Sequence, residues 1–178
     1  MTLPSFRTRR PEGNNSLRFP LSFSGRLALL DTDLRGIPGS GNFASSDIRG
    51  LTEFSPESLA LPLDAALRVA DQKLRGLLDL PSLRFAIVIL SSPGTGALAQ
   101  HHRDLLWSAF GLPMFEQLCD GDGRVIAREC EIHDGLHFDT MPELPDFTVE
   151  IVHERCECGL ETPRLRYLFT PKVQAAAA

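Results

Sequence analysis

The sequence predicts an α/β fold, in which a β-α-β parallel-sheet unit is followed by a small antiparallel or mixed β section. Residues 85–90, FAIVIL, form a continuous apolar run, as expected of a strand buried on both faces of a parallel sheet. An amphipathic stretch and a second apolar run follow directly along the chain. Beyond Arg124 the pattern changes to short β-type runs separated by turn residues.

The length of 178 residues supports one hydrophobic core. We expect residues 1–17, which are rich in Arg, Pro, Gly and Asn, to form a mobile N-terminal arm. Residues 18–172 are expected to form a single α/β domain, and the alanine-rich residues 173–178 a frayed tail.

The first elements after the arm are predicted to be two short strands, LRFPLSF (17–23) and GRLALLDTD (25–33). The glycine-rich residues 35–50 are predicted to be a structural turn, since they lack the Gly-Lys-Ser/Thr ending of a nucleotide P-loop. Ser55 followed by Pro56 predicts a helix start. After Pro62, apolar residues recur with a helical period on one face that we expect to be core, namely Leu63, Ala66, Leu67, Ala70, Leu74 and Leu77.

The β-α-β unit spans residues 85–118. Its helix is predicted over residues 98–110 with Gly111 as the stop signal, and its second strand is MFEQL (114–118). Strands joined in this way are parallel, and ligands usually bind beyond their carboxyl ends. Here those ends lead into SSPGTG (91–96) and CDGDGR (119–124). The later short strands are predicted in VIAREC, LHFD, FTVEIV and LRYLF.

Two clusters of metal-ligand residues lie in this later section. Cys130 and His133 form a C-x-x-H pair, and Cys156 and Cys158 form a C-x-C pair ahead of Gly159. Zinc prefers four such thiolate and imidazole ligands in a tetrahedron, and a closed shell of this kind is structural. Both clusters fall at predicted strand ends, so the sequence predicts a structural zinc site, with His137 as the alternative fourth ligand.

Other interpretations of these residues stay open. The cysteines could be small buried hydrophobes, which explains Cys119 well, or a redox or catalytic thiol. A catalytic metal with a bound water and Glu129 or Glu131 as the base is a further alternative. The acidic residues of this section could form a solvated face, support histidine ligands or bind magnesium; they are Glu129, Glu131, Asp134 and Asp139.

Composition argues against several partners. The formal net charge is −5 with no basic stripe, so no nucleic acid partner is expected. No run approaches the ~20 apolar residues needed to span a bilayer, and the N-terminus lacks the apolar core of a signal peptide. We therefore expect no membrane association and a cytoplasmic protein.

Four stretches of the sequence carry a resemblance to a known family: LLWSAFGLPMFEQL, IARECEIHDGLHFD, FTVEIV and CECGLETPRL. Over about residues 83–168, half of the chain, the order of these motifs resembles the central part of phenylacetate–CoA ligase-like enzymes. These enzymes are a branch of the adenylate-forming (AMP-binding) acyl-CoA synthetases. The resemblance implies ATP-dependent activation of a carboxylic acid and transfer to coenzyme A. It also implies a structural zinc on Cys130, His133, Cys156 and Cys158, as in some members.

For a nucleotide, the resemblance places Ser92 and Gly94 in the family's adenine-side loop. It places Asp120 and Asp122 where the family has an aromatic-Gly-x-Thr/Ser-Glu motif, whose glutamate helps to hold magnesium. The aromatic and hydroxyl residues are absent here, so Asp120 or Asp122 would take Mg-ATP. The sequence also shows no upstream phosphate loop ending in Lys, and we expect no C-terminal domain to carry the usual catalytic lysine.

These departures predict a zinc-stabilised, truncated ligase-like domain that is not catalytic alone, acting as a binding or accessory module or surviving as a remnant. The alternative is part of a split or minimal acid–CoA ligase, completed by a partner chain that supplies the missing parts. A homodimer is a further expectation, because a sheet edge left without its family strands needs covering.

Overall fold

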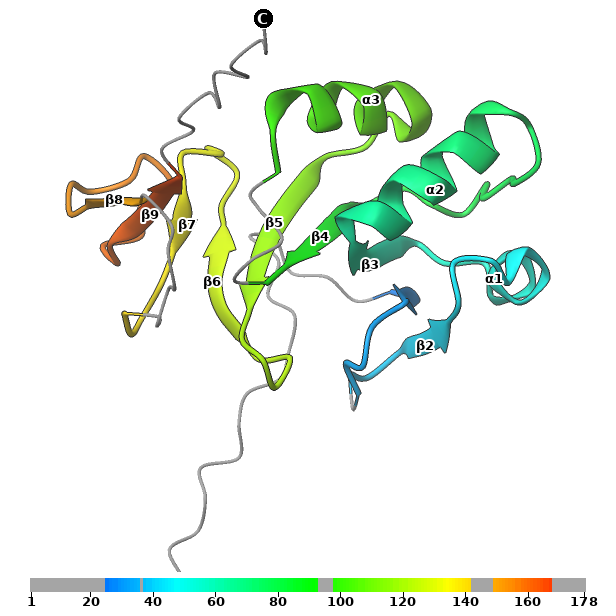
Figure 1. Ribbon diagram of the computed structural model, residues 1–178, viewed down its shortest axis with the longest axis horizontal. Coiled ribbons are helices and arrows are strands. Elements are labelled where there is room, and N and C mark those ends of the chain that lie inside the picture. The colour runs from blue at the N-terminus through cyan, green and yellow to red at the C-terminus, as the bar shows by residue number, and fades with distance from the viewer. Residues whose placement is uncertain (1–24, 36, 93–97, 142–148, 168–178) are drawn as a thin grey trace, which may run out of the picture.

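A computed structural model of the chain describes residues 25–35, 37–92, 98–141 and 149–167. Within these ranges nine strands form one sheet, in the order β2-β1-β3-β4-β5-β6-β7-β9-β8 (Figure 1). Neighbouring strands are parallel from β2 to β5, and antiparallel from β5 to β8. The predicted α/β fold, a parallel unit followed by an antiparallel section, is therefore confirmed.

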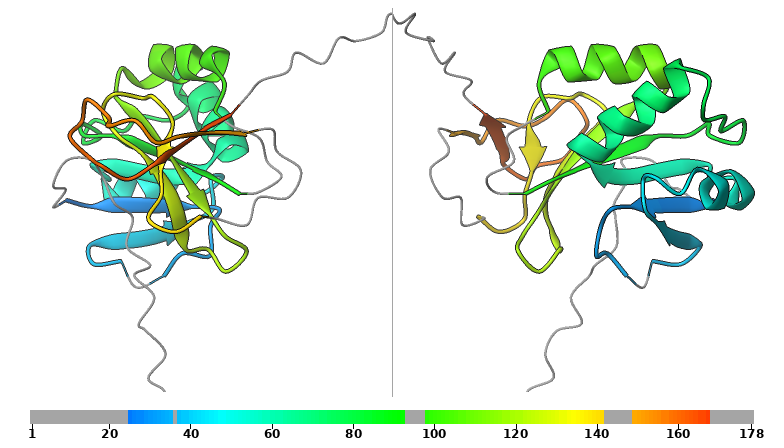
Figure 2. Two further views of the ribbon diagram at one scale, coloured as in Figure 1. Left: turned by 90° about the vertical axis from the view of Figure 1, so that its left-hand side faces the viewer. Right: turned by 45° about the vertical axis from the view of Figure 1, so that its right-hand side comes forward.

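The parallel part contains five strands and three helices. The strands are β1 (Leu27–Leu30), β2 (Ser40–Phe43), β3 (Ser58–Pro62), β4 (Ile87–Ser91) and β5 (Met114–Cys119). The helices are α1 (Ile48–Phe54), α2 (Leu63–Leu74) and α3 (Gln100–Phe110). The predicted β-α-β unit corresponds to β4, α3 and β5, and α2 and α3 lie over one face of the sheet (Figures 1 and 2).

The antiparallel part lies at the other end of the sheet. It consists of β6 (Val125–Glu129), β7 (Leu136–His137), β8 (Val149–Val152) and β9 (Arg164–Tyr167). Strand β9 lies between β7 and β8, although β8 precedes it in the sequence. This order brings the segment before β9 alongside β7, which decides the geometry of the candidate site.

Hydrophobic cores lie on both faces of the parallel strands. On the helix side, Ala66, Val69 and Ala70 of α2 pack with Ile87 and Ile89 of β4, and all five are buried. On the opposite side, Leu27, Leu29 and Val88 pack with Leu34, which follows β1. Side chains alternate between the two faces along each strand. Because both faces are buried, these strands appear in the sequence as continuous apolar runs.

One predicted element is wrong. The helix start predicted at Ser55 is a helix end: Ser55 caps the C-terminus of α1 in a left-handed conformation, with φ of 52°. The residues that follow form β3, which pairs with β1 and β4 and is fully buried at Leu59 and Leu61. Burial between two neighbouring strands outweighs the local Ser-Pro signal and the weak strand propensity of this segment.

The described part of the glycine-rich segment, residues 35 and 37–50, contains regular secondary structure, whereas a structural turn was predicted. They include β2 and the start of α1, where the Asp47 carboxylate accepts a hydrogen bond from the Gly50 amide at 2.9 Å. Three predictions lie outside the described residues: the arm at 1–17, the strand LRFPLSF and the tail at 173–178. Among the helices that the structure describes, none is long and apolar enough to cross a membrane.

Candidate metal centre

Three segments of the antiparallel part carry the residues of the site. The turn between β6 and β7 begins with Cys130, and β7 ends with His137. The loop between β8 and β9 carries Cys156 and Cys158. Because Arg164, the first residue of β9, pairs with His137, the end of this loop comes to lie beside β7. Residues that are far apart in the sequence thus meet at one place.

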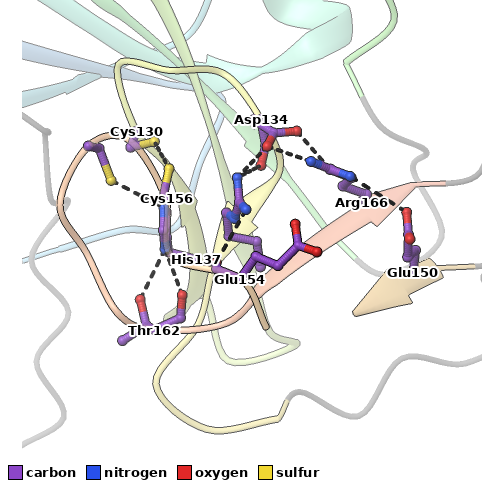
Figure 3. Close-up of polar contacts among 10 residues, drawn as sticks. Cys130, Asp134, His137, Glu150, Glu154, Cys156, Thr162 and Arg166 are labelled. Carbon is purple, nitrogen blue, oxygen red and sulfur yellow. Dashed lines mark hydrogen bonds and ion pairs between the residues drawn. The ribbon is translucent and has the colours of Figure 1, made fainter. Parts of the chain in front are cut away.

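The four side chains form one compact group. The ligand atoms of Cys130, His137, Cys156 and Cys158 all lie within 4.8 Å of one another. The Cys130 and Cys156 sulfurs are 3.7 Å apart (Figure 3). The Cys158 sulfur is 3.5 Å from His137 Nε2. Cys158 is half-buried and the other three residues are buried. Such a group could hold a metal such as zinc.

The spacing matches the dimensions of tetrahedral zinc. With Zn–S near 2.3 Å and Zn–N near 2.0–2.1 Å, two sulfurs of a tetrahedron are about 3.8 Å apart, and a sulfur and a nitrogen about 3.6 Å apart. Two of the six separations in this site are 3.7 Å and 3.5 Å, and all six are at most 4.8 Å. Three soft sulfur donors and one imidazole are also a donor set that zinc takes in closed structural sites.

The imidazole of His137 is oriented by Thr162. His137 Nδ1 lies 3.1 Å from the Thr162 carbonyl oxygen and 3.0 Å from its hydroxyl oxygen (Figure 3). A carbonyl oxygen only accepts, so Nδ1 carries the proton and Nε2 keeps its lone pair on the side of Cys158. Burial lowers the pKa of His137, which favours the neutral imidazole that binds metals.

The pKa values of the Cys130 and Cys156 thiols are shifted in opposite directions. Burial, together with the neighbouring Cys158 and Cys156 thiols, raises the pKa of Cys130 to about 12. Burial also opposes ionisation of Cys156, but hydrogen bonds from the Cys158 amide and from the adjacent thiols, with the charge of Arg164, lower the pKa of Cys156. Of these two thiols, Cys156 therefore ionises before Cys130.

His133, the first sequence-based choice for the fourth ligand, is not part of this group. Its Nδ1 lies 3.1 Å from Glu129 Oε1, and its ring stacks on Phe115 with centroids 5.3 Å apart. The backbone at His133 is left-handed, with φ of 57°, in the turn that separates Cys130 from β7. The structure instead brings the alternative, His137, to the three cysteines.

Two glycines shape the ligand-bearing turns. Gly135 has φ of +89°, and a Cβ there would lie 2.6 Å from the Leu165 carbonyl oxygen. Gly159 has φ of +88°, and its amide donates to the Cys156 carbonyl at 3.0 Å to close the C-x-C turn. Both turns favour glycine, because a residue with a Cβ would be strained at this positive φ.

The carboxylates near the site have separate partners. Glu129 is buried, accepts a hydrogen bond from the Glu116 amide at 2.8 Å and pairs with Arg103 at 2.7 Å. Asp134 pairs with Arg164 and Arg166. Glu131 and Asp139 are exposed. The interpretation of these carboxylates as a solvated face therefore fits Glu131 and Asp139, but not the buried Glu129. The residue that contacts the ligand histidine is Thr162, which the sequence analysis did not identify.

The residues suggested for a nucleotide lie elsewhere in the sheet. Asp120 and Asp122 are in the turn after β5, and Ser92 follows the neighbouring strand β4. Asp120 Oδ1 accepts hydrogen bonds from the amides of Asp122 and Arg124, at 3.0 and 2.8 Å. The Asp120 carboxylate thus holds this turn. Gly94 lies outside the described residues.

Solved structures with a similar fold include a ligase in two states. No family model matches the sequence, and a search of curated proteins finds no match. 2-Hydroxyisobutyryl-CoA ligase in an open conformation, in complex with 2-HIB-AMP and CoA, aligns with a TM-score of 0.55 and 12% identity, over 79% of this chain and 44% of that chain. The same ligase in its thioesterification state gives a TM-score of 0.54 and 13% identity, over 79% and 42%.

The likeness defines the class of fold. At these identities it shows the fold alone: the chain is similar in fold to part of 2-hydroxyisobutyryl-CoA ligase. VinN gives a lower TM-score of 0.47, with 19% identity over 78% of this chain and 37% of that chain. The chain spans less than half the length of the 2-hydroxyisobutyryl-CoA ligase that it matches.

Proposed function

We propose that the chain is a zinc-stabilised domain of the phenylacetate–CoA ligase-like type that acts as a binding or accessory module and does not activate acids alone. The observation that carries this proposal is the buried group of three cysteines and His137, with ligand atoms within 4.8 Å. Zinc bound there would join the β6–β7 turn to the loop before β9. Its role would be structural, because four protein ligands leave no position for a substrate or water.

Two features support a role without acid activation. The end of β5 and the turn after it read LCDGDG, without the aromatic and hydroxyl residues of the family motif. One of the two carboxylates in this turn that could bind magnesium, Asp120, already accepts two backbone hydrogen bonds. Adenylation depends on groups arranged in advance around the reacting phosphate, and this turn provides few of them.

The metal part of the proposal is tested by cysteine variants. Native mass spectrometry under reducing conditions is expected to show one zinc per chain, and Cys156→Ser and Cys158→Ser are each expected to lose it. Cys119→Ser is the matched control, because Cys119 is also buried but lies outside the group. Zinc retained by both Cys156→Ser and Cys158→Ser would contradict the assignment of these ligands.

A second candidate function is a part of a split or minimal acid–CoA ligase, completed by a partner chain. The position of Asp120 and Asp122 favours it, because they follow the carboxyl end of β5, next to the end of β4. Ligands of open α/β sheets usually bind at such an edge, which is also the edge where Ser92 follows β4. Magnesium could then bridge an aspartate and phosphate oxygens.

This second function predicts saturable binding of Mg-ATP that is weakened by Asp122→Ala. Asp122 is the better position for this substitution. It is exposed, and among the described residues its carboxylate contacts Arg124 at 3.5 Å, whereas the Asp120 carboxylate accepts hydrogen bonds that stabilise the turn. Isothermal titration calorimetry of the zinc-loaded chain is the measurement. No binding at millimolar ATP would count against the ligase function and would leave the accessory role in place.

A further inference from the structure

A single buried arginine connects the two ligand-bearing segments. Arg164 Nη1 donates to the Asp134 carbonyl oxygen at 3.2 Å and to the Asp134 carboxylate, in the turn between Cys130 and His137. Arg164 Nη2 donates to the Glu154 carbonyl oxygen at 3.3 Å, two residues before Cys156. One guanidinium thus holds both the β6–β7 turn, at Asp134, and the start of the C-x-C loop, at Glu154.

The position of Arg164 in the sheet places it beside the metal group. It is the direct cross-strand partner of His137 in the antiparallel pair of β7 and β9. Side chains at such paired positions point to the same face, with Cβ atoms about 5 Å apart. Arg164 is only 4% exposed, so water screens its charge poorly. Its Nε–H is buried and has no hydrogen-bond partner among the described residues.

The charge of the proposed zinc centre requires a nearby cation. Three thiolates and a neutral imidazole around a divalent metal leave one net negative charge. A buried net charge is unfavourable unless an opposite charge lies close to it. Of the two arginines that pair with Asp134, Arg166 is 38% exposed and also pairs with Glu150. Arg164 is the buried one.

We propose that Arg164 is a positioning residue of the metal centre, which holds the two ligand-bearing segments together and offsets the net negative charge of the zinc-bound cysteines. This inference rests on the proposed zinc site and deepens it. The role is specific to Arg164, since Arg166 shares the contact with Asp134 but contacts no carbonyl oxygen of either ligand-bearing segment in any hydrogen bond that the structure describes.

The test is zinc affinity, measured by competition with a chromogenic chelator in reducing buffer. Arg164→Gln is expected to weaken zinc binding by about 10- to 100-fold, the usual effect of losing a group that supports metal ligands. Arg166→Gln is the matched control and is expected to change the affinity by less than about threefold, as for an exposed ion pair. Arg164→Lys keeps the cation and is expected to recover most of the loss, although it lacks the planar fork.

The outcomes separate this inference from the proposed function. A wild-type chain without zinc would overturn both. Zinc binding by the wild type with unchanged affinity in Arg164→Gln would overturn only the role of Arg164, and equal losses in Arg164→Gln and Arg164→Lys would overturn the charge-compensating part. If Arg164→Gln does not fold even with excess zinc, Arg164→Lys decides. It keeps the positive charge but lacks the planar fork that contacts both Asp134 and the Glu154 carbonyl oxygen, so it must bind zinc more weakly than Arg166→Gln, and equal affinities would overturn the inference.

Discussion

Removal of zinc with a chelator is expected to lower the melting temperature of the chain by about 10 °C or more. A metal that binds only the folded chain adds its binding free energy to stability, about 4 kcal/mol at a thousandfold excess over the dissociation constant. For a protein of this size, 1 kcal/mol shifts the melting temperature by about 2–4 °C. The ligands come from the β6–β7 turn, from β7 and from the loop between β8 and β9, which only the folded sheet brings together, so the effect should be large.

Differential scanning fluorimetry with and without chelator measures this shift. The Cys156→Ser, Cys158→Ser double variant is the control, because it should melt at the temperature of the chelated wild type and respond no further to chelator. Reductant must be present throughout, since the Cys130 and Cys156 sulfurs are only 3.7 Å apart and oxidation could replace the metal as a cross-link. A structural role would be contradicted if the melting temperature of the metal-loaded wild type did not change when chelator is added.

Gly135→Ala is expected to destabilise the fold by about 3 kcal/mol or more and to weaken zinc binding. A non-glycine residue in a strained backbone conformation costs about 1–3 kcal/mol, and the added Cβ would also lie 2.6 Å from the Leu165 carbonyl oxygen. That oxygen belongs to the backbone of β9 and cannot move alone, so the turn must shift. Because the same turn joins Cys130 to β7, the shift would disturb the zinc ligands. Urea unfolding of the zinc-loaded and chelated protein measures both effects.

Gly159→Ala is the matched control for this prediction. Gly159 has nearly the same φ, +88°, and lies in the other ligand-bearing loop, but a Cβ there would have no atom within 4 Å. It should therefore lose only about 1–2 kcal/mol, the cost of the left-handed conformation. Equal losses in Gly135→Ala and Gly159→Ala would show that the close approach of Gly135 to β9 contributes nothing.

The sequence predicted the elements whose local pattern and burial agree. The strands at FAIVIL and MFEQL, the helix between them and the short strands after Arg124 all occur, within a few residues of their predicted bounds. Strand β3 was missed because its core, Leu59 to Leu61, has weak strand propensity and follows a Ser-Pro pair that resembles a helix start. Its state depends on the strands on both sides, β1 and β4, which no local pattern reveals.

The same distinction applies to the candidate site. The spacing of the cysteines indicated a metal group, and the structure brings all three together. The choice between His133 and His137 depends on the left-handed backbone at His133, which a three-residue spacing does not encode. Thr162 and Arg164 reach His137 only through the register of β9 against β7, so no motif in the sequence marked them.

X-ray absorption at the zinc edge of the purified, reduced protein tests the central claim most directly. The account predicts one zinc per chain, with three sulfur neighbours at about 2.3 Å and one nitrogen neighbour at about 2.0 Å. The same spectrum from His137→Ala should lose the nitrogen neighbour, whereas His133→Ala should leave it unchanged, since His133 lies against Glu129 and Phe115. Protein free of zinc, or zinc surrounded only by oxygen and nitrogen, would contradict the account.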